Sequence, residues 1–540
     1  MRLNRAFCAD MLRLFHPLAR LARSLLEPPR RAQAIAVGIV AAVALLVGWR
    51  TTSPSWSMGI NWDTAGYATD IGNAAPWAKL PWNSHFGVGH VYWLAMHLAP
   101  HLGLTALDGI RLLNALALAA STVVLTICAL HLRLRPVLAA LTGGLYLASW
   151  GTLILVFTWE DNVLVHPAGL AALAICLLHL GAWRWRYSLY AGLAVGLSSL
   201  MSWQGAAYAL PVMYVALVLA GRDRRWWQRA RDVALVPLGL ALARWLWLSL
   251  YWLTAHSLSY AGLVRTAFES PSPNFLPQGL SQWLALLGNP RAILTHMGIG
   301  VCHELGPTVR DSAAIGPYLP YLGAGLFCLA LIPWMVAVAR SRKGTGGPFH
   351  FIAAAFLLMT LMAAIYLDLP VDKYKRYDYI PAFISLAFAV VARHATSSGL
   401  RKNARIFICL AAAILVGQGV AALRWNRQWY AKLPSTAPKD YAGHGNQTWF
   451  AYMRETGRQA PNACSFVFSF DEVSHARYQL EITAALLSEL RQPKVIGAPL
   501  SAREWPRRLP LADSKTVAAS LRGCEWLSPG ARRLRPEAGR

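Results

Sequence analysis

The chain has 540 residues, of which 56% are hydrophobic and only 14% are charged. Soluble domains carry about 25% charged residues, so this composition excludes a water-soluble globule and also disordered, collagen-like and coiled-coil proteins. The net charge of +26 would suggest nucleic-acid binding in a soluble protein, but here the basic residues follow the loops between apolar segments. Uncharged segments such as 32–49 and 112–130 are long enough, at about 18 residues or more, to span a membrane. We therefore expect a polytopic membrane protein with no nucleic-acid partner.

The apolar segments predict an all-α bundle of about eleven transmembrane helices. The uninterrupted segment 187–220 would be about 51 Å long as one helix, whereas the hydrocarbon core is about 30 Å thick. We therefore expect a hairpin at Ser202–Gly205. The predicted spans are 32–49, 110–130, 137–157, 163–183, 187–203, 205–220, 233–255, 314–339, 349–367, 378–392 and 406–423.

The Lys and Arg residues predict the orientation of the bundle, because positively charged loops stay in the cytoplasm. The basic tail 1–31 and every second loop together hold 23 of these residues, and the intervening loops hold eight. This alternation predicts a cytoplasmic N-terminus and an outer segment after residue 423. Arg111 and Arg244 fall within spans, where an arginine is a functional candidate unless it pairs with backbone carbonyls or an acid.

Residues 424–540 form a hydrophilic segment that is long enough for a small outer domain. The alternation in Ser465–Phe470 is typical of a strand, and Leu and Ala recur at helical spacing in 475–491, so we expect a small α/β fold. Cys464 and Cys524 are the two cysteines of this segment, and in an oxidising compartment they are candidates for a disulfide. Spacing alone leaves free thiols equally open.

The first outer loop, about 50–108, is unusually long for a helical bundle, and such loops are usually functional. Asp63 follows shortly after the first span and could accept a proton from an attacking hydroxyl. It could instead cap an interfacial helix that begins at Thr64, a common role for Asp. His85 and His90 either face a site or are polar residues of an interfacial segment.

The second outer loop is the short segment 158–162, which contains Glu160, Asp161 and Asn162. Two adjacent carboxylates without a local cation favour acceptor binding, coordination of a divalent metal, or a second acid–base group. The alternative is a polar turn in which Asp161 or Asn162 caps the next helix. The sequence leaves both interpretations open.

A third outer loop, 368–381, holds Lys373, Lys375 and Arg376 among tyrosines that include Tyr377. Clustered cations beside aromatic residues suit the phosphate of a lipid, which an arginine binds bidentately. The same residues could instead anchor a short helix at the lipid headgroups. A basic cluster on the outer side runs against the general charge bias, which favours phosphate binding.

Four short motifs together resemble the membrane glycosyltransferases of the GT-C superfamily, which include protein mannosyltransferases and the lipid A aminoarabinose transferase. The motifs are Asn61–Tyr67, Trp82–Trp93, Trp159–Asn162 and Lys373–Pro381, within a module over 32–423. The resemblance implies a polyprenyl-phosphate sugar as donor and transfer at the outer face of a bacterial inner membrane. The acceptor would be a lipid, a glycan or a protein, and the C-terminal domain would be periplasmic.

By this resemblance Asp63 matches the catalytic carboxylate of the first loop, and Glu160 and Asp161 match the acidic pair of the second. The basic segment Lys373, Lys375, Arg376 and Tyr377 matches the side that binds the donor phosphate. The double proline of several branches is absent, so the sugar and the acceptor are not identified. The further candidates for substrate binding are Trp62, Tyr67, His85, His90 and Asn162.

Two other classes of membrane protein stay open. A polymerase or ligase of lipid-linked glycans would use a large outer loop rich in Arg and His, and the loop 256–313 has this composition. A transporter or flippase would have ionisable residues at mid-membrane and internal repeats, but charge within the spans is nearly limited to Arg111 and Arg244. A cytosolic enzyme that uses a sugar nucleotide is disfavoured, because no phosphate-binding glycine loop follows a strand.

Overall fold

The structure is a computed structural model that describes residues 28–52, 86–104, 106–157, 161–220, 224–255, 347–366 and 379–397, with four single residues between 409 and 420. All regular elements within these ranges are helical. The predicted outer domain at 424–540 and the predicted span at 314–339 lie outside the described residues. Their structure therefore stays a prediction, as does the total of eleven spans.

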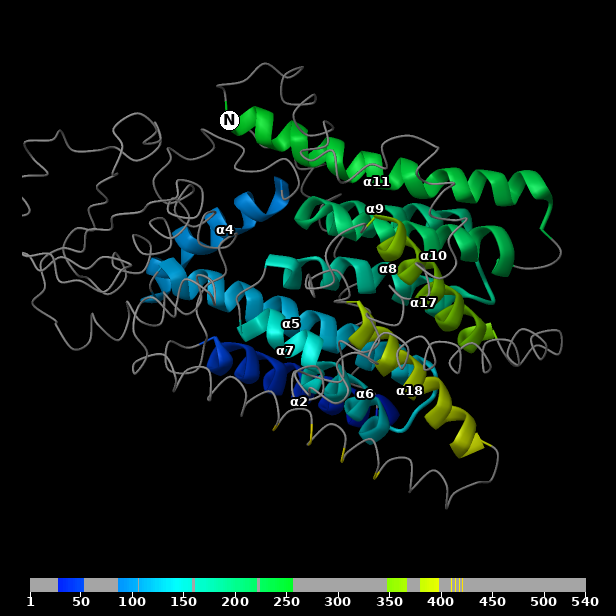
Figure 1. The fold of residues 1–540 in the computed structure, drawn as a ribbon, viewed down its shortest axis with the longest axis horizontal. Helices are drawn as coiled ribbons and strands as arrows, with labels where there is room; N and C mark the ends of the chain where they lie inside the picture. Colours follow the sequence, from blue (N-terminus) through cyan, green and yellow to red (C-terminus); the bar gives the residue numbers. More distant parts are fainter. Residues whose placement is uncertain are drawn as a thin grey trace, which may run out of the picture.

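In chain order the described helical elements are α2 (Pro28–Thr51), α4 (Phe86–Leu98), the 3₁₀ turn η1 (Ala99–Leu102), α5 (Ala106–His131), α6 (Pro136–Ala148), α7 (Trp150–Phe157), the 3₁₀ turn η2 (Asp161–Leu164), α8 (His166–His179), α9 (Trp185–Met201), the 3₁₀ turn η3 (Trp203–Tyr208), α10 (Ala209–Tyr214), the π turn η4 (Val215–Leu219), α11 (Trp226–Ala255), α17 (Gly347–Tyr366) and α18 (Ile380–Ser397). Most of the described helices run in a similar direction across the view of Figure 1, whereas α4 is inclined against α5.

Four of the described helical segments are long and apolar enough to cross a membrane by length and composition: Arg31–Thr51, Asp108–His131, Asn162–His179 and Trp226–Leu250. Shorter apolar helices occur within other predicted spans, among them Pro136–Ala148 and Gly347–Met359. A helical membrane bundle, as the composition predicts, is therefore the fold of the described part. The chain crosses the membrane more than once.

The helix α2 shows how the bundle meets lipid. Its small side chains, such as Ala36 and Ala44, are buried, whereas its large apolar side chains point outward. These exposed side chains are Ile35, Ile39, Val43 and Leu46. At Gly48 an added Cβ would lie 2.9 Å from the backbone of Ala115 on α5, so the missing side chain lets the two helices approach closely. Small residues at the helix–helix contact are typical of membrane bundles.

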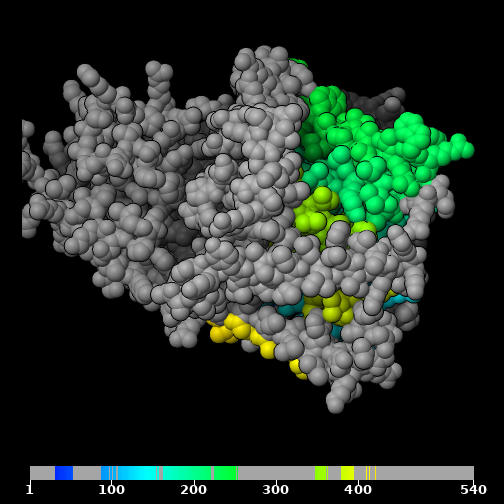
Figure 2. Space-filling model, turned by 45° about the vertical axis from the view of Figure 1, so that its right-hand side comes forward, coloured from blue at the N-terminus to red at the C-terminus, as the bar shows by residue number. Residues whose placement is uncertain are grey.

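The contact between α9 and α11 follows the same rule. Gly192 and Gly196, four residues apart on α9, leave no room for a Cβ against Val236 and Leu240 of α11. The helix α11 buries this side and exposes several large apolar residues on the other, including Trp245. Part of α11 and α17 is visible on the face shown in Figure 2. An apolar outer face suits a helix that is in contact with lipid.

Three local details refine the predicted spans. The hairpin expected at Ser202–Gly205 is present, because α9 ends at Met201 and the turn η3 follows. The span predicted at 137–157 is two helices, since Ser149 leaves the helical conformation and its Oγ lies 2.8 Å from Thr152 Oγ1. The first outer loop is not loop throughout, because it contains α4 and η1.

Candidate functional site

Hydrogen bonds between helix ends define one end of the bundle. Arg111, near the start of α5, donates from Nη2 to the carbonyl of Trp49 near the end of α2 at 3.0 Å. Ser198, near the end of α9, donates to the carbonyl of Val165 before α8 at 2.8 Å. We call this the site end; it comprises the C-termini of α2 and α9 and the N-termini of α5 and α8. At the opposite end Gly347, which begins α17, lies against Leu180 after α8.

Arg111 is held at this end by three kinds of contact. Besides its bond to Trp49, its guanidinium forms an ion pair with Asp108 one turn earlier on α5. It also lies over the Trp49 ring, 4.2 Å from the ring centroid, which is a cation–π distance. This arginine, which the sequence places in a span, therefore binds the end of α2 to the start of α5.

Arg244 is the second arginine within a span, and only 1% of it is exposed. Its Nη1 donates to the carbonyl and to the hydroxyl of Ser199 on α9, at 3.2 and 3.3 Å. The pairing with a backbone carbonyl that the sequence left open is therefore present. Arg244 joins α11 to α9 at the site end.

His90 lies on α4, and its Nδ1 accepts a hydrogen bond from Nε1 of Trp247 on α11 at 2.5 Å. The two ring centroids are 5.5 Å apart. Burial lowers the pKa of His90 well below its usual value, so the ring is neutral and suited to accept at Nδ1. This candidate for substrate binding thus also connects α4 to α11.

The described part of the second outer loop begins at Asp161 and forms η2. Asn162 is only 2% exposed, and its Oδ1 accepts no hydrogen bond in the described part of the chain. The residue at the N-cap position of α8 is Val165. Asn162 therefore does not cap the next helix, and that alternative was wrong for this residue. Its backbone carbonyl accepts from Val165 N at 3.0 Å, which closes the turn.

Sequence reasoning missed Asn114, which lies on α5 one turn after Arg111. Its side chain is fully buried, and neither Oδ1 nor Nδ2 has a partner among the described residues. The turn η2 packs against α5, so Asn162 and Asn114 lie on neighbouring elements. A single Asn in an apolar span belongs to no sequence motif. Asn114 is distinguished only by the burial of its side chain without a hydrogen-bond partner among the described residues.

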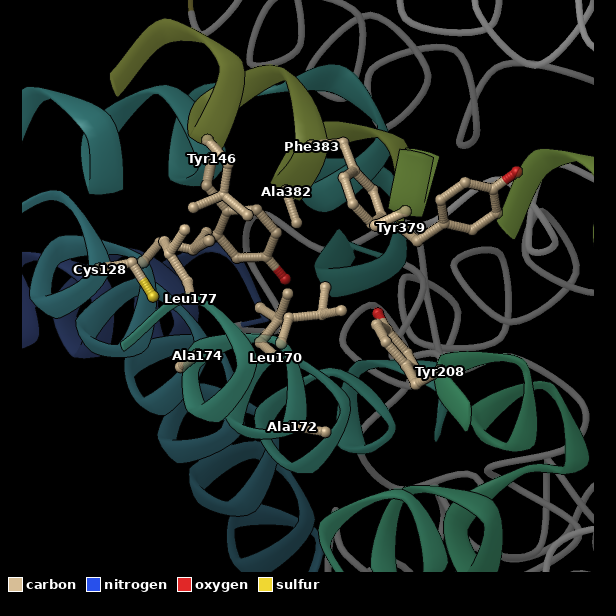
Figure 3. Close-up of a cluster of buried hydrophobic side chains, with 14 of the residues drawn as sticks. Cys128, Tyr146, Leu170, Ala172, Ala174, Leu177, Tyr208, Tyr379, Ala382 and Phe383 are labelled. Atoms are coloured by element: carbon tan, nitrogen blue, oxygen red, sulfur yellow. The ribbon is translucent and has the colours of Figure 1, made fainter. Parts of the chain in front are cut away.

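Aromatic and histidine side chains meet at the start of α8, which follows η2 in the chain. His166, at the start of α8, is buried, and its Nδ1 lies 3.4 Å from the hydroxyl oxygen of Tyr208 on η3. The Tyr146 ring of α6 meets His166 edge-on, with centroids 6.4 Å apart. Figure 3 shows the Tyr146 and Tyr208 hydroxyls pointing into the same region between the helices. Gly169 leaves room for the Tyr208 ring, which an added Cβ would strike.

The N-terminus of α18 reaches the same region. Tyr379, directly before α18, is buried, and its ring packs edge-on against Phe383 at 6.0 Å between centroids. In Figure 3, Tyr379 and Phe383 lie on the same side of the cluster as Tyr208, and the Tyr379 hydroxyl points away from Tyr208. The third predicted loop, 368–381, whose described part begins at Tyr379, therefore returns to the bundle at the site end.

Most residues of the predicted site lie outside the described residues, and for Asp161 only the backbone is described. The candidates outside are Asp63, Trp62, Tyr67, His85, Glu160, Lys373, Lys375, Arg376, Tyr377, Cys464 and Cys524. The described ranges contain no group of three His, Cys, Asp or Glu side chains that could hold a metal ion.

Comparisons with known proteins gave one kind of match. No family model and no curated protein matches the chain. Two crystal structures of ArnT from Cupriavidus metallidurans match at 16% identity. The form bound to undecaprenyl phosphate matches with a TM-score of 0.41, over 87% of this chain and 86% of that chain. The apo form matches with a TM-score of 0.42, over 85% of each chain. With TM-scores below 0.5, no residue role and no substrate follow from the likeness.

Proposed function

We propose that this chain is a membrane glycosyltransferase that takes a sugar from a polyprenyl-phosphate donor. It transfers the sugar, with inversion, to a lipid, glycan or protein acceptor at the outer face of a bacterial inner membrane. The observation that carries the proposal is the common position of three loop anchors. The residues that border the three motif-bearing loops, Thr52, Asn162 and Tyr379, all belong to helix ends at the site end.

This position matters because the three loops carry the opposed charges that the reaction needs. The loop after Thr52 contains Asp63, the loop before Asn162 contains Glu160, and the loop before Tyr379 contains Arg376. Loops anchored at one end of a bundle can meet over that end, whereas loops at opposite ends of a membrane protein cannot. The common position of the anchors therefore supports a single site that contains both the acidic and the basic residues of these loops.

The distribution of arginines supports an outer location for the site end. The described arginines in helix ends and loops of the opposite end are Arg30, Arg31, Arg133, Arg135, Arg184, Arg186, Arg224, Arg225, Arg229, Arg231 and Arg393. Those described at the site end are Arg50, Arg111 and Arg244, of which the last two have partners within the bundle. Because basic segments stay in the cytoplasm, this asymmetry favours an outward-facing site end.

In the proposed reaction an acceptor hydroxyl attacks the anomeric carbon of the donor sugar. The new C–O bond forms as the bond from that carbon to the phosphate oxygen breaks, and the electron pair leaves with the polyprenyl phosphate. Asp63 takes the hydroxyl proton. Lys373, Lys375 and Arg376 stabilise the charge that develops on the phosphate. Attack from the face opposite the leaving group inverts the anomeric centre.

The test is transfer by the purified protein in liposomes. The substrates are a panel of radiolabelled polyprenyl-phosphate hexoses and pentoses, with extracted bacterial envelope lipids and glycans as acceptors. We expect label in the acceptor, release of sugar-free polyprenyl phosphate, and a product of opposite anomeric configuration. Intact donor after incubation with the whole panel would contradict the proposal. Retention of the anomeric configuration would contradict the single-base mechanism alone.

A further inference from the structure

We propose that Asn114 and Asn162 form a binding site for the uncharged, hydroxyl-bearing sugar of the donor, separate from the cations that bind its phosphate. We call these two residues the amide pair. The inference rests on the proposed function for the identity of the donor. The unpartnered side chains that carry it are observed independently of that proposal.

Both residues of the amide pair are buried in the bundle. Asn114 is 0% exposed and Asn162 is 2% exposed, yet Oδ1 and Nδ2 of Asn114 and Oδ1 of Asn162 have no hydrogen-bond partner among the described residues. Buried side-chain amides in folded proteins are almost always hydrogen-bonded. Within a membrane bundle no bulk water relieves them. Two such residues on elements that pack together, α5 and η2, indicate that something else binds there.

Comparison with other polar residues of α5 shows that the amides are a special case. Thr122 and Thr126 each donate to the carbonyl four residues earlier, at 2.7 and 2.9 Å, so they are satisfied within their own helix. The buried hydroxyl of Ser121 has no partner in the described residues, but a rotation brings a serine hydroxyl onto the same kind of carbonyl. An amide has two donor hydrogens and an acceptor oxygen, and a helix offers nothing to the acceptor.

The hydrogen-bonding atoms that lack a partner determine which kind of ligand fits. Both Oδ1 atoms need a donor, whereas Nδ2 of Asn114 needs an acceptor. A phosphate at neutral pH offers mainly acceptors and would place negative charge against two amide oxygens. A metal cation would satisfy the oxygens and leave Nδ2 without a partner. Hydroxyl groups donate and accept at once, so a sugar meets all three needs, as does water.

The position of the pair fits this assignment. Asn114 lies one turn from Arg111, whose bond to Trp49 marks the site end, and Asn162 follows directly on the acidic loop. His166, four residues after Asn162 in the chain, is buried and in contact with Tyr208 and Tyr146. Aromatic rings beside neutral hydrogen-bonding groups suit a sugar, which has apolar faces and polar edges.

The experiment compares thermal unfolding and lipid affinity of the full-length protein in detergent. The variants are Asn114→Leu and Asn162→Leu, with Asn114→Ser as a milder second variant. The matched control is Ser121→Ala, which removes another buried and unpartnered polar group from the same helix. The probes are undecaprenyl phosphate without a sugar and the panel of polyprenyl-phosphate hexoses and pentoses.

We expect wild type and Ser121→Ala to bind at least one sugar-bearing lipid more tightly than the sugar-free lipid. In the amide variants this preference should fall about tenfold, which corresponds to one hydrogen bond, while affinity for undecaprenyl phosphate is kept. Without lipid, the melting temperature of the leucine variants should not fall, because an unpartnered amide is replaced by an apolar side chain.

Three results would overturn the inference. The first is a sugar preference in the amide variants equal to that of wild type, which would leave water as the occupant. The second is equal affinity of wild type for sugar-bearing and sugar-free lipids across the panel. The third is a lower melting temperature without lipid in all amide variants, Asn114→Ser included, with Ser121→Ala unaffected, which would indicate a structural role. Wild type that binds neither kind of lipid would refute the proposed function itself.

Discussion

The two ends of the bundle use buried polar side chains differently. At the opposite end the carboxylate of Asp232, which is fully buried in α11, forms an ion pair with Arg224 at 2.7 Å. At the site end, Asn114 and Oδ1 of Asn162 are buried without a partner in the described residues. A buried charge is tolerated when it is paired, and a pair of this kind fixes how the chain enters a helix. A buried amide without a partner does not fix the position of a helix in this way. We therefore infer that the two amides are retained because they bind a ligand.

This contrast predicts that substitutions at the site end change activity, whereas those at the opposite end change stability.

The largest effect is expected for Asp63→Asn. Loss of a general base typically lowers a rate by about 10²–10⁴, so turnover should fall at least a hundredfold while donor binding and expression stay normal. Transfer of the radiolabelled sugar measures the rate. Asn caps a helix about as well as Asp, so wild-type transfer by this variant would favour the capping role and move the base to Glu160 or Asp161.

At the opposite end, Asp232→Ala should lower stability and leave kcat unchanged. It leaves the largely buried Arg224 and the half-exposed Arg231 without their carboxylate, at a cost of about 3 kcal/mol. Denaturant titration in mixed micelles measures this loss, and Arg225→Ala, which removes an exposed neighbouring charge, is the control. A fall in kcat at unchanged stability would contradict the division between the two ends.

A smaller effect is expected for Arg376→Ala at the donor phosphate. A charge-assisted hydrogen bond contributes roughly 1.5–3 kcal/mol, so apparent affinity for the donor should fall about ten- to a hundredfold. Titrations of donor and acceptor separate the two substrates, and affinity for the acceptor should be nearly unchanged. Equal losses for both, or none, would assign the basic segment to membrane anchoring.

The smallest effect is expected for Tyr214→Phe. The Tyr214 hydroxyl and Nε2 of His350 are 2.6 Å apart and join α10 to α17 at the opposite end. Removing the hydroxyl should lower the free energy of unfolding by about 1 kcal/mol without a change in transfer. Tyr190→Phe, which removes the hydroxyl of an exposed tyrosine, is the control. A change in the rate of transfer would show that this contact is coupled to the site.

The sequence predicts the outline of the bundle well, because length and apolar composition are what the membrane demands of a helix. The span at 32–49 corresponds to α2, and the turn after Met201 lies where the length limit required a break. The break at Ser149 was missed, since a serine in an apolar segment has no strong signal. Tertiary contacts, and not composition, decide whether such a helix continues.

The site was predictable only in part. The motif-bearing loops are visible as polar interruptions of an apolar pattern, and their anchors meet at one end. The partner of Arg244 could not be chosen from sequence, because Ser199 lies 45 residues away on another helix. Asn114 was missed because its significance lies in its lack of a hydrogen-bond partner among the described residues, which depends on the packing of other helices around it.

The most direct test of the account is the side of the membrane that the site end faces. His101→Cys lies between α4 and α5 at the site end, and Arg135→Cys lies between α5 and α6 at the opposite end, and both positions are exposed. Each is introduced into a background without the eight native cysteines and treated with a membrane-impermeant maleimide. The account predicts labelling of His101→Cys in intact cells and of Arg135→Cys only after permeabilisation. The reverse pattern would place the site end in the cytoplasm and contradict transfer at the outer face.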